Sequence, residues 1–362
     1  MKCEVCQEEK VLAKILSSCR DCLREHPEKT KSLILKAHRV SREEFGLPYP
    51  PPKAKGGVIC QFCQNKCQLG EGAISFCGLR KNENGKLKVL ADREEGILQW
   101  YYDPLPTNCV ASFFCQGSEE FEKKNLAVFY GSCTFNCLFC QNWHYKYLAK
   151  SLSPKVSAKT LIGAIDKDTF CICFFGGDPT PQISYALKTC ESIFKKENSP
   201  RHSTGRGEFI SPRICWETNG AMSENLLRKI AEFSLKSGGI IKFDLKAFNE
   251  NLHYALCGVS NRQTFKNFEF LAKEYLPKAR GGFLAALTLL VPGYIDRREI
   301  EKIAKFIANL NPNIPYSLLG FYPHFFMRNL PLFSQKEAQE CLTIAKEVGL
   351  ENVRLGNLNL FS

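Results

Sequence analysis

The 362-residue sequence contains no long hydrophobic run. Its longest apolar stretch covers residues 283–291, whereas a helix that crosses a bilayer needs roughly 20 such residues. The N-terminal residues also lack the apolar segment of a secretory signal peptide. We therefore expect a cytoplasmic protein that makes no membrane contact.

The sequence also lacks internal repeats and the skewed composition of a disordered chain. Hydrophobic residues make up 44% and charged residues 24%, which is typical of a folded protein. The formal net charge of +12 favours acidic partners, either nucleic acid or an acidic electron donor such as a ferredoxin or flavodoxin. A generally basic surface without a specific partner would give the same charge.

Cysteine, by contrast, is abundant, because the chain has 19 cysteines. In a chain without a secretory signal, many cysteines indicate metal ligation in a reducing compartment rather than a disulfide framework. The odd count also argues against complete pairing in disulfides. The spacing of the cysteines is therefore the main guide to function.

The most informative cysteines form one C-x3-C-x2-C loop, made of Cys133, Cys137 and Cys140. A cubane of four irons needs four ligands, so a loop with three thiolates leaves one iron open to a small molecule. Structural zinc sites close all four positions instead. The apolar, β-prone residues 126–130 place the loop at the carboxyl end of a strand, where αβ barrels keep their chemistry. A zinc site or a chance spacing is the simpler alternative.

Two C-x2-C pairs near the N-terminus can direct four sulfurs at one ion. They consist of Cys3, Cys6, Cys19 and Cys22. This arrangement predicts structural zinc, with a rubredoxin-like iron site as the alternative. Residues 28–45 then show the apolar spacing of an amphipathic helix, and the Pro- and Gly-rich residues 46–57 indicate a semi-rigid linker.

A second set of four cysteines follows within a short glycine-containing segment. It consists of Cys60, Cys63, Cys67 and Cys77. The set can close one tetrahedral site, and zinc and an auxiliary iron-sulfur cluster are equally good interpretations, with unligated thiols as the third. Cys109 and Cys115 are weaker candidates for further ligands, because a C-x5-C pair alone is weak evidence.

From residue 126 onward, strand-type runs alternate with amphipathic helical runs. The expected strands are residues 126–130, 170–175, 212–217, 239–244, 284–291 and 316–321. This rhythm predicts an α/β fold with a parallel sheet, and six units are too few to close an eight-stranded barrel. We expect a partial, open (β/α)6 TIM-like barrel. The expected domains are residues 1–45, the linker 46–57, the second cysteine segment 58–118 and the barrel 119–362.

Glycines and polar residues follow several of the expected strands. They are Gly176, Gly177 and Asp178 after the second strand, Glu217 at the end of the third with Thr218 and Asn219 after it, Asp244 at the end of the fourth with Lys246 after it, and His324 after the sixth. Glycines let backbone groups approach a ligand where a Cβ would clash. Each feature also has a simpler interpretation: a turn at the glycines, a surface ion pair, or a packed histidine.

The cysteine loop, with Phe139 directly before its third cysteine, resembles the signature of radical S-adenosylmethionine (SAM) enzymes. Residues 58–335 as a whole resemble the pyruvate formate-lyase-activating-enzyme-like branch, and in particular the AmmeMemoRadiSam group. The resemblance implies that SAM chelates the open iron through its amino and carboxylate groups. One electron then splits SAM into methionine and a 5'-deoxyadenosyl radical, which abstracts hydrogen from a substrate.

The same resemblance implies roles for the strand-end residues. Gly176, Gly177 and Asp178 are similar to a Gly-Gly-Glu-Pro motif that meets the SAM amino group, with Asp in place of Glu. Thr218 and Asn219 belong to a turn that surrounds the methionyl group. Lys246 would pair with the SAM carboxylate, Glu217 and Asp244 would lie near a monovalent cation, and His324 would contribute to SAM binding. Glu217 stands where the activases carry Asp.

We therefore expect a radical SAM oxidoreductase that abstracts hydrogen from a macromolecular or protein substrate, with a glycyl-radical activase as the named sub-case. Two other classes stay open. A tRNA-modifying or other nucleic-acid-modifying radical SAM enzyme would suit the basic charge and the N-terminal thiols. A non-enzymatic zinc or iron-sulfur scaffold would cleave no SAM on reduction. The residues that contact the substrate lie in loops without transferable motifs, so the sequence does not identify the substrate.

Overall fold

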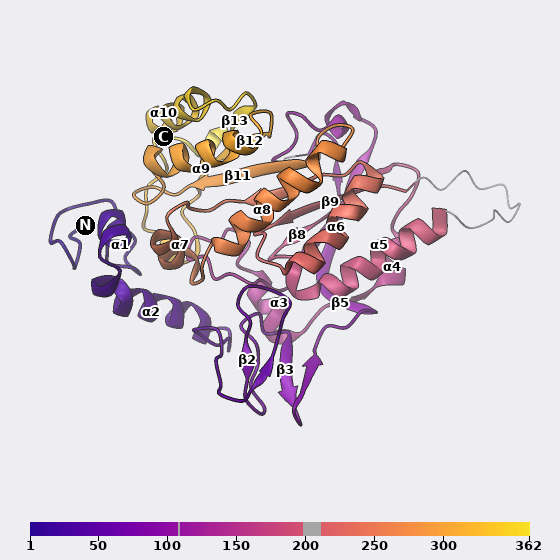
Figure 1. Ribbon diagram of the computed structural model, residues 1–362, viewed down its shortest axis with the longest axis horizontal. Helices are drawn as coiled ribbons and strands as arrows, with labels where there is room; N and C mark the ends of the chain where they lie inside the picture. The colour runs from indigo at the N-terminus through magenta and orange to yellow at the C-terminus, as the bar shows by residue number, and fades with distance from the viewer. Residues whose placement is uncertain (108, 198–210) are drawn as a thin grey trace, which may run out of the picture.

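The computed structural model describes residues 1–107, 109–197 and 211–362 (Figure 1). Its centre is a nine-stranded sheet with the order β13-β12-β11-β10-β9-β8-β6-β5-β7. These strands are β5 (Glu95–Pro104), β6 (Lys124–Tyr130), β7 (Lys155–Ser157), β8 (Thr169–Gly176), β9 (Arg213–Thr218), β10 (Ile241–Asp244), β11 (Leu284–Leu290), β12 (Tyr316–Gly320) and β13 (Val353–Gly356).

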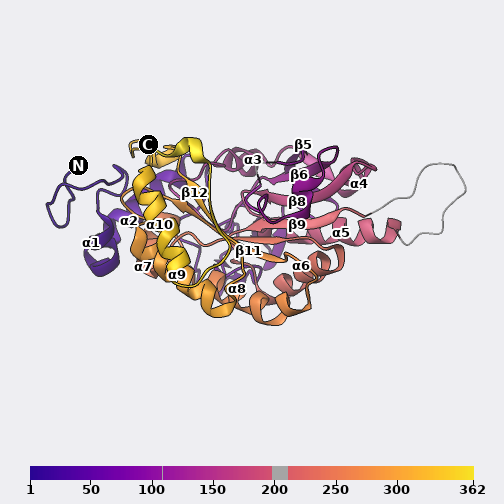
Figure 2. The same cartoon turned by 90° about the horizontal axis from the view of Figure 1, so that it is seen from above.

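The seven strands from β6 and β8 to β13 run parallel and are connected through helices. These helices are α3 (Tyr145–Ser151), α4 (Ala158–Gly163), α5 (Ile183–Glu197), α6 (Glu224–Ser237), α7 (Glu250–Cys257), α8 (Arg262–Glu274), α9 (Arg297–Leu310) and α10 (Gln335–Glu347). Figure 2 shows α6, α8, α9 and α10 along the outer side of the curved sheet. In the described residues β7 and β13 are free edges, so the barrel is open, as predicted.

The six expected strands are present, and three further strands extend the sheet. β13 adds a seventh parallel strand, while β5 and β7 pair antiparallel beside β6. β13 and β7 are only four and three residues long, too short to give a recognisable period. In β5 the buried residues lie together at positions 96–98 instead of alternating with exposed ones, so its sequence lacks the pattern of a half-buried strand.

Helix α9 illustrates how the sequence sets these elements. The Asp296 side chain accepts a hydrogen bond from the Glu299 backbone N–H and so caps the helix. Ile300, Ile303 and Ile307 recur at helical spacing and are fully buried, which docks one face of α9 on the core. The polar face stays outside. Among the helices of the described residues, none has both the length and the apolar character needed to span a membrane.

The N-terminal residues pack on the barrel rather than apart from it. They contain α1 (Arg20–Glu25) and α2 (Pro27–Glu43), close to the helix predicted over 28–45. Both Arg24 guanidinium Nη atoms donate to the Asp296 carboxylate, at 3.1 and 2.8 Å. The Tyr294 hydroxyl accepts from the Ala13 backbone N–H at 2.8 Å. Figure 1 accordingly shows α1 beside α7, at the same end of the sheet as α9 and α10.

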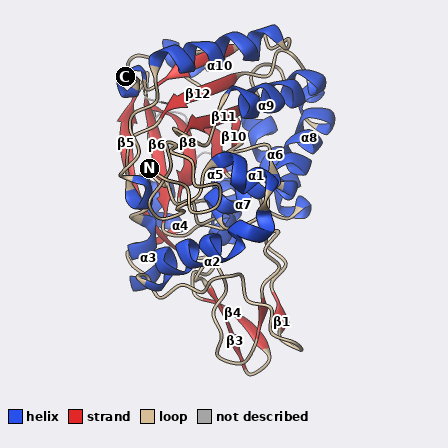
Figure 3. Ribbon diagram, turned by 90° about the vertical axis from the view of Figure 1, so that its left-hand side faces the viewer, coloured by secondary structure: helices blue, strands red, loops and turns tan. Residues whose placement is uncertain are grey.

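The second cysteine segment forms two small antiparallel sheets that project from the barrel (Figure 3). They are built from β1 (Val58–Ile59) with β2 (Gln68–Leu69), and β3 (Arg80–Glu83) with β4 (Lys86–Val89). The expected linker 46–57 is anchored here, because the Lys53 ammonium donates to the carbonyls of residues 65 and 66, at 2.9 Å each. The domain boundaries at residues 45, 57 and 118 stay predictions.

Candidate active site

The carboxyl ends of the parallel strands surround one cavity of about 130 Å³. Its lining includes most of the predicted residues, namely Cys133, Cys137, Phe139, Cys140, Gly176, Gly177, Glu217, Thr218, Asn219, Asp244 and Lys246. Phe135, Gln141, Asn142, Tyr145, Leu287, Leu289 and Leu319 also line it and were not predicted. Phe135 lies within the cysteine motif, and Gln141 and Asn142 directly follow it, so the motif is the sequence signal that points to these three.

The cysteine loop is held in place through backbone bonds to the end of α7. The Asn136 N–H donates to the Cys257 carbonyl at 2.9 Å, and the Leu138 N–H donates to the Leu256 carbonyl at 3.0 Å. This pairing brings the Cys257 thiol to 3.6 Å from the Cys137 thiol. Cys257 does not line the cavity, so three thiols face it. Three ligands on one cavity wall are what a cubane with one open iron requires.

Burial determines the protonation state of these thiols in the metal-free protein. It raises the pKa of Cys133 well above its ordinary value, and it raises the pKa of Cys140 to about 12. A hydrogen bond from the Cys257 thiol instead lowers the pKa of Cys137. Because a metal binds the thiolate, loading this site releases protons.

Two lysines pair with the two acidic residues of the cavity. The Lys246 ammonium lies 2.8 Å from the Asp244 carboxylate, and the Lys242 ammonium lies 3.4 Å from the Glu217 carboxylate. Burial alone would lower the pKa of Lys246, but Asp244 and the neighbouring thiols hold it well above its ordinary value. Lys246 is therefore a permanent cation. Lys246 is mostly buried, so its pairing with Asp244 is not the surface ion pair that was the simpler interpretation of the sequence.

The two glycines after β8 permit a close approach of chain segments. Gly176 has a φ of +105°, in the left-handed region that side chains disfavour. A Cβ on Gly177 would lie 2.1 Å from the Ser132 carbonyl oxygen at the start of the cysteine loop. Any other residue at this position would therefore push the cysteine loop away from β8.

Asp178 lies behind the cavity rather than in its lining. Its carboxylate accepts hydrogen bonds from the Thr218 hydroxyl at 2.6 Å and from the backbone N–H groups of Asn219 and Thr180, at 3.1 and 3.0 Å. Burial raises its pKa. The resemblance implies contact with the SAM amino group, but the structure places Asp178 as a tie between β8 and β9. Aspartate is one methylene shorter than the glutamate of the related motif, which fits this retracted position.

His324 also lies outside the cavity lining. Its Nε2 accepts a hydrogen bond from the Trp143 indole N–H at 2.9 Å. Trp143 belongs to the cysteine loop and stacks on Phe325, with ring centroids 5.4 Å apart. In this structure His324 therefore supports the outer side of the cysteine loop.

Helix α2 supports the cysteine loop from behind, a contact that the sequence did not reveal. The Asn136 amide donates to His38 Nδ1 and to the Ser41 hydroxyl, each at 2.8 Å. The Asn136 carbonyl oxygen accepts from the Lys146 ammonium at 2.7 Å. His38 Nε2 donates to the Ala255 carbonyl at 3.0 Å, so this network fixes one neutral tautomer of His38. Burial lowers the pKa of His38 to about 3.

We expect His38 to make the folded protein acid-sensitive. The unfolded chain binds a proton at His38 below a pKa of about 6.5, whereas the folded chain binds it only near 3, so stability falls as pH drops between these values. The loss is up to about 1.4 kcal/mol per pH unit. Urea unfolding at several pH values should show a shallower pH dependence in His38→Gln. The exposed control His26→Gln should follow the wild type, and a His38→Gln slope equal to wild type would contradict this account.

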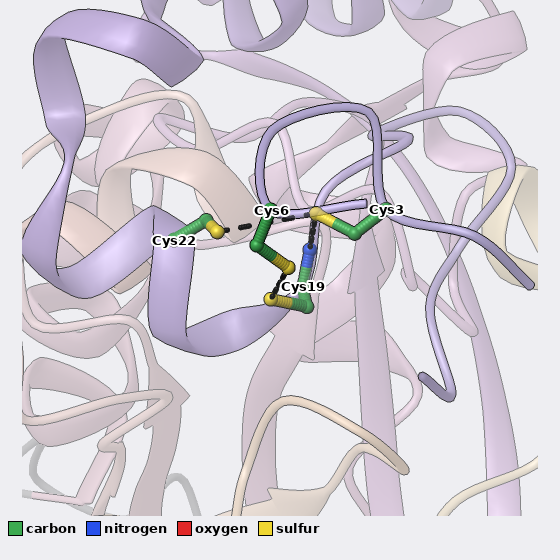
Figure 4. A group of neighbouring side chains, drawn as sticks. All are labelled: Cys3, Cys6, Cys19 and Cys22. Atoms are coloured by element: carbon green, nitrogen blue, oxygen red, sulfur yellow. Dashed lines mark hydrogen bonds between the residues drawn. The ribbon is translucent and has the colours of Figure 1, made fainter. Parts of the chain in front are cut away.

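The four N-terminal cysteines come together as predicted (Figure 4). The sulfur atoms of Cys3, Cys6, Cys19 and Cys22 all lie within 4.8 Å of one another. The Cys3–Cys22 and Cys6–Cys19 sulfur pairs are 3.9 and 3.8 Å apart. A metal-sulfur bond of about 2.3 Å gives a tetrahedron with an edge of roughly 3.8 Å. The set is therefore already spaced for one ion.

The second cysteine set contacts the candidate active site without lining it. The Ser132 hydroxyl donates to the Cys77 carbonyl at 2.7 Å, and the Asn65 amide donates to the Thr134 carbonyl at 2.8 Å. Burial raises the pKa of Cys67 to about 11, and the nearby Cys77 thiolate makes a smaller contribution in the same direction. In the described residues, these four cysteines do not form a group that could share one metal ion. The set is therefore not closed around a single ion.

Comparisons with solved structures give remote similarities only. A domain of a pyruvate-formate lyase-activating enzyme from Bacteroides vulgatus is 18% identical and has a TM-score of 0.40, with 52% of this chain and 99% of that chain covered. A radical SAM methyltransferase from Sphaerobacter thermophilus is 15% identical and has a TM-score of 0.47, with 65% and 67% covered. These scores are too low to support an argument about the site.

Sequence comparisons are more informative. A protein of Methanocaldococcus jannaschii, provisionally assigned as a glycyl-radical enzyme activating enzyme, is 27% identical over 223 residues, which cover 60% of this chain and 74% of that protein. An uncharacterized protein of the same organism is 22% identical over 306 residues, covering 83% and 81%. A sequence model of the radical SAM superfamily matches residues 127–307, half of this chain. The chain belongs to the radical SAM superfamily.

Proposed function

We propose that this protein reductively cleaves SAM at a 4Fe-4S cluster and abstracts hydrogen from a protein substrate. The observation that carries the proposal is the single cavity lined by Cys133, Cys137 and Cys140 together with Lys246. Three thiols would ligate three irons, and the fourth iron would be open to SAM. When bound and reduced, the cluster supplies the electron that splits a carbon-sulfur bond of SAM, giving methionine and a 5'-deoxyadenosyl radical.

The residues around the thiols have separate tasks in this proposal. Lys246, a permanent cation, binds the SAM carboxylate through a charge-assisted hydrogen bond. Gly176 and Gly177 line the cavity, and Gly177 lets the start of the cysteine loop lie against the end of β8. Asp178 acts as a positioning residue, because it ties the Thr218 and Asn219 turn to β8. Phe139 and Leu287 give the cavity apolar walls, which limit water near the radical.

A protein substrate is supported by the M. jannaschii relative, whose provisional assignment is to an activase of glycyl-radical enzymes. An acidic electron donor, a ferredoxin or flavodoxin, would suit the net charge of +12. The nucleic-acid alternative makes a different prediction. If RNA copurifies with the protein and dissociates steeply with rising salt, RNA and not a protein would be the substrate.

The decisive experiment uses anaerobically reconstituted protein with dithionite and SAM. We expect 5'-deoxyadenosine and methionine in equal amounts, and a change in the cluster spectrum when SAM is added. A fully loaded protein that forms no 5'-deoxyadenosine would contradict the proposal and favour a non-enzymatic scaffold. Deuterium in the 5'-deoxyadenosine after incubation with a deuterated candidate protein would identify that protein as the source of hydrogen.

Replacing Lys246 with Ala should weaken SAM binding without loss of iron. The lost charge-assisted hydrogen bond is worth roughly 1.5 to 3 kcal/mol, or about a 10- to 150-fold rise in Kd. The variant also leaves the Asp244 carboxylate without its partner, which repels the SAM carboxylate. Calorimetry on the reconstituted proteins measures the effect, with Lys305→Ala on the exposed side of α9 as the control. Equal Kd values for both variants would rule out Lys246 as a SAM ligand.

We also propose that the N-terminal thiol set binds one structural zinc ion. Its sulfurs are closed around one position. None of them lines the cavity proposed to bind SAM, which we call the SAM cavity. For the second set, Cys60 to Cys77, we propose a bound metal whose identity stays open between zinc and an auxiliary iron-sulfur cluster. A monovalent cation near Glu217 and Asp244 stays a prediction, since both carboxylates already pair with lysines.

A further inference from the structure

Five cysteines outside the sets described above line one cavity inside the half barrel. They are Cys109, Cys115, Cys171, Cys173 and Cys215, which we call the interior thiol cluster. The cavity has a volume of about 280 Å³. Glu217 and Asn142 line both this cavity and the SAM cavity, so the two spaces adjoin.

Strand register brings three of these thiols to one face of the sheet. Cys173 on β8 pairs directly with Cys215 on β9, and Cys171 lies two residues before Cys173 on the same face. On β9, Glu217 follows Cys215 by two residues and therefore also shares this face. The face thus leads from the thiols, near the starts of the strands, to the SAM cavity at their carboxyl ends.

The other two thiols come from the loop between β5 and β6, which is held against the sheet. The Ser317 hydroxyl of β12 donates to the Val110 carbonyl at 2.9 Å, and the Arg354 guanidinium of β13 donates to the Ser112 hydroxyl at 3.1 Å. Both contacts hold the segment between Cys109 and Cys115. The loop thereby places Cys109 and Cys115 opposite the strand cysteines.

Backbone N–H groups point at three of the five sulfur atoms. Ala111 donates to Cys109 at 3.5 Å, Gly117 donates to Cys115 at 3.4 Å, and Ile240 donates to Cys215 at 3.4 Å. Hydrogen bonds of this kind stabilise negative charge on sulfur and tune thiolate-ligated metal centres. Neutral thiols packed as small apolar side chains would have no need of them.

A buried cation lies among the same sulfurs. The Lys242 ammonium is 3.2 Å from the Cys109 sulfur and 3.2 Å from the Cys173 sulfur. The Lys242 side chain is only 2% exposed. A buried ammonium is costly unless anionic partners surround it. Glu217 provides one such partner, and a metal centre with several thiolate ligands, which is a net anion, would provide another.

We propose that the interior thiol cluster binds an iron-sulfur cluster, distinct from the one at Cys133, Cys137 and Cys140. A mononuclear zinc site is less suitable, because its tetrahedral edge is roughly 3.8 Å. Among the described residues, these five sulfurs do not form a group that could share one metal ion, in contrast to the N-terminal set. Thiolates that bind different irons are separated by the width of the cluster, which suits both this arrangement and the size of the cavity. The proposal does not depend on SAM cleavage.

The test measures iron and acid-labile sulfide after anaerobic reconstitution with ferrous iron and sulfide. The parent is Cys133→Ala/Cys137→Ala/Cys140→Ala, which lacks the proposed SAM cluster. Adding Cys109→Ser/Cys115→Ser/Cys173→Ser leaves two interior thiols, so iron and sulfide should each fall by about four per chain. Adding Cys190→Ser/Cys341→Ser on α5 and α10 instead should remove neither. Unchanged iron, or loss of zinc in place of iron, would overturn the proposal.

A second measurement needs no variant and therefore does not depend on whether the substitutions are tolerated. The reconstituted wild-type protein is treated with iodoacetamide under anaerobic conditions, and alkylated cysteines are mapped by mass spectrometry. Cys109 and Cys115 are partly exposed, so they should be alkylated after iron is removed with a chelator. In the iron-loaded protein both should be protected. Equal labelling in the two states would overturn the proposal.

Discussion

Replacing Cys133 or Cys140 with Ala is expected to abolish 5'-deoxyadenosine formation under dithionite. Either change leaves two thiols on the cavity wall, too few to hold a cubane whose fourth iron is reserved for SAM. The expected loss is therefore complete within detection rather than a partial reduction in rate. Product formation is measured by chromatography after anaerobic reconstitution, with iron content determined on the same samples.

The Cys137 variant needs a different design because of its neighbour. The Cys257 sulfur lies 3.6 Å from the Cys137 sulfur and could take its place as a ligand. The double variant Cys137→Ala/Cys257→Ala removes this substitute and should be inactive like the other two. Cys341→Ala, on α10 and away from every thiol set, is the matched control and should keep full activity. Full turnover in Cys133→Ala or Cys140→Ala would show that this loop does not hold the reactive cluster.

The sequence was sufficient to predict the parallel core of the fold. The apolar runs that became β6, β8 and β11 are long, and each ends at a clear break, so their positions were predicted to within two residues. The edges of the sheet were not predicted. β13 is four residues long and is defined by its pairing with β12, which is a tertiary contact rather than a local pattern.

The site was predictable where the cysteines lie on one short segment, because their spacing along the chain then determines how they are arranged in space. The C-x3-C-x2-C loop and the paired C-x2-C motifs fold as compact units, so their cysteines converge in the structure as the sequence predicted. Side-chain reach was harder to infer. Asp178 has the expected position in the chain, yet its short carboxylate bonds to Thr218 and Asn219 instead of entering the cavity.

The contacts that the sequence could not show join distant segments. Cys257 meets Cys137 across 120 residues, and His38 meets Asn136 across 98. The interior thiol cluster depends on the register that pairs Cys173 with Cys215. A shift of one residue between β8 and β9 would turn one of these thiols to the other face of the sheet. No single-sequence pattern specifies that register.

Loss of the proposed N-terminal zinc is expected to release residues 1–25 from the barrel. Apart from its cysteines, this segment buries four hydrophobic residues, Leu12, Ala13, Leu16 and Leu23. Zinc binding supplies about 10–16 kcal/mol in comparable small domains. The variant Cys6→Ser/Cys19→Ser breaks both C-x2-C pairs and should lose one zinc per chain by metal analysis. Limited proteolysis should then cleave within residues 1–25, which are protected in the wild type by the contacts of Arg24 and Tyr294.

Reductive SAM cleavage should persist in this variant. The N-terminal sulfurs do not line the SAM cavity, whereas the residues that support the cysteine loop, His38 and Ser41, lie further along on α2. A deletion that extends into α2 should therefore damage the active site, while loss of zinc alone should not. The double variant Cys190→Ser/Cys341→Ser controls for the removal of two cysteines. If the wild type contains iron instead of zinc at the N-terminal set, the rubredoxin-like alternative is correct. If Cys6→Ser/Cys19→Ser cannot hold the SAM cluster, the N-terminal metal site and the SAM site are not independent.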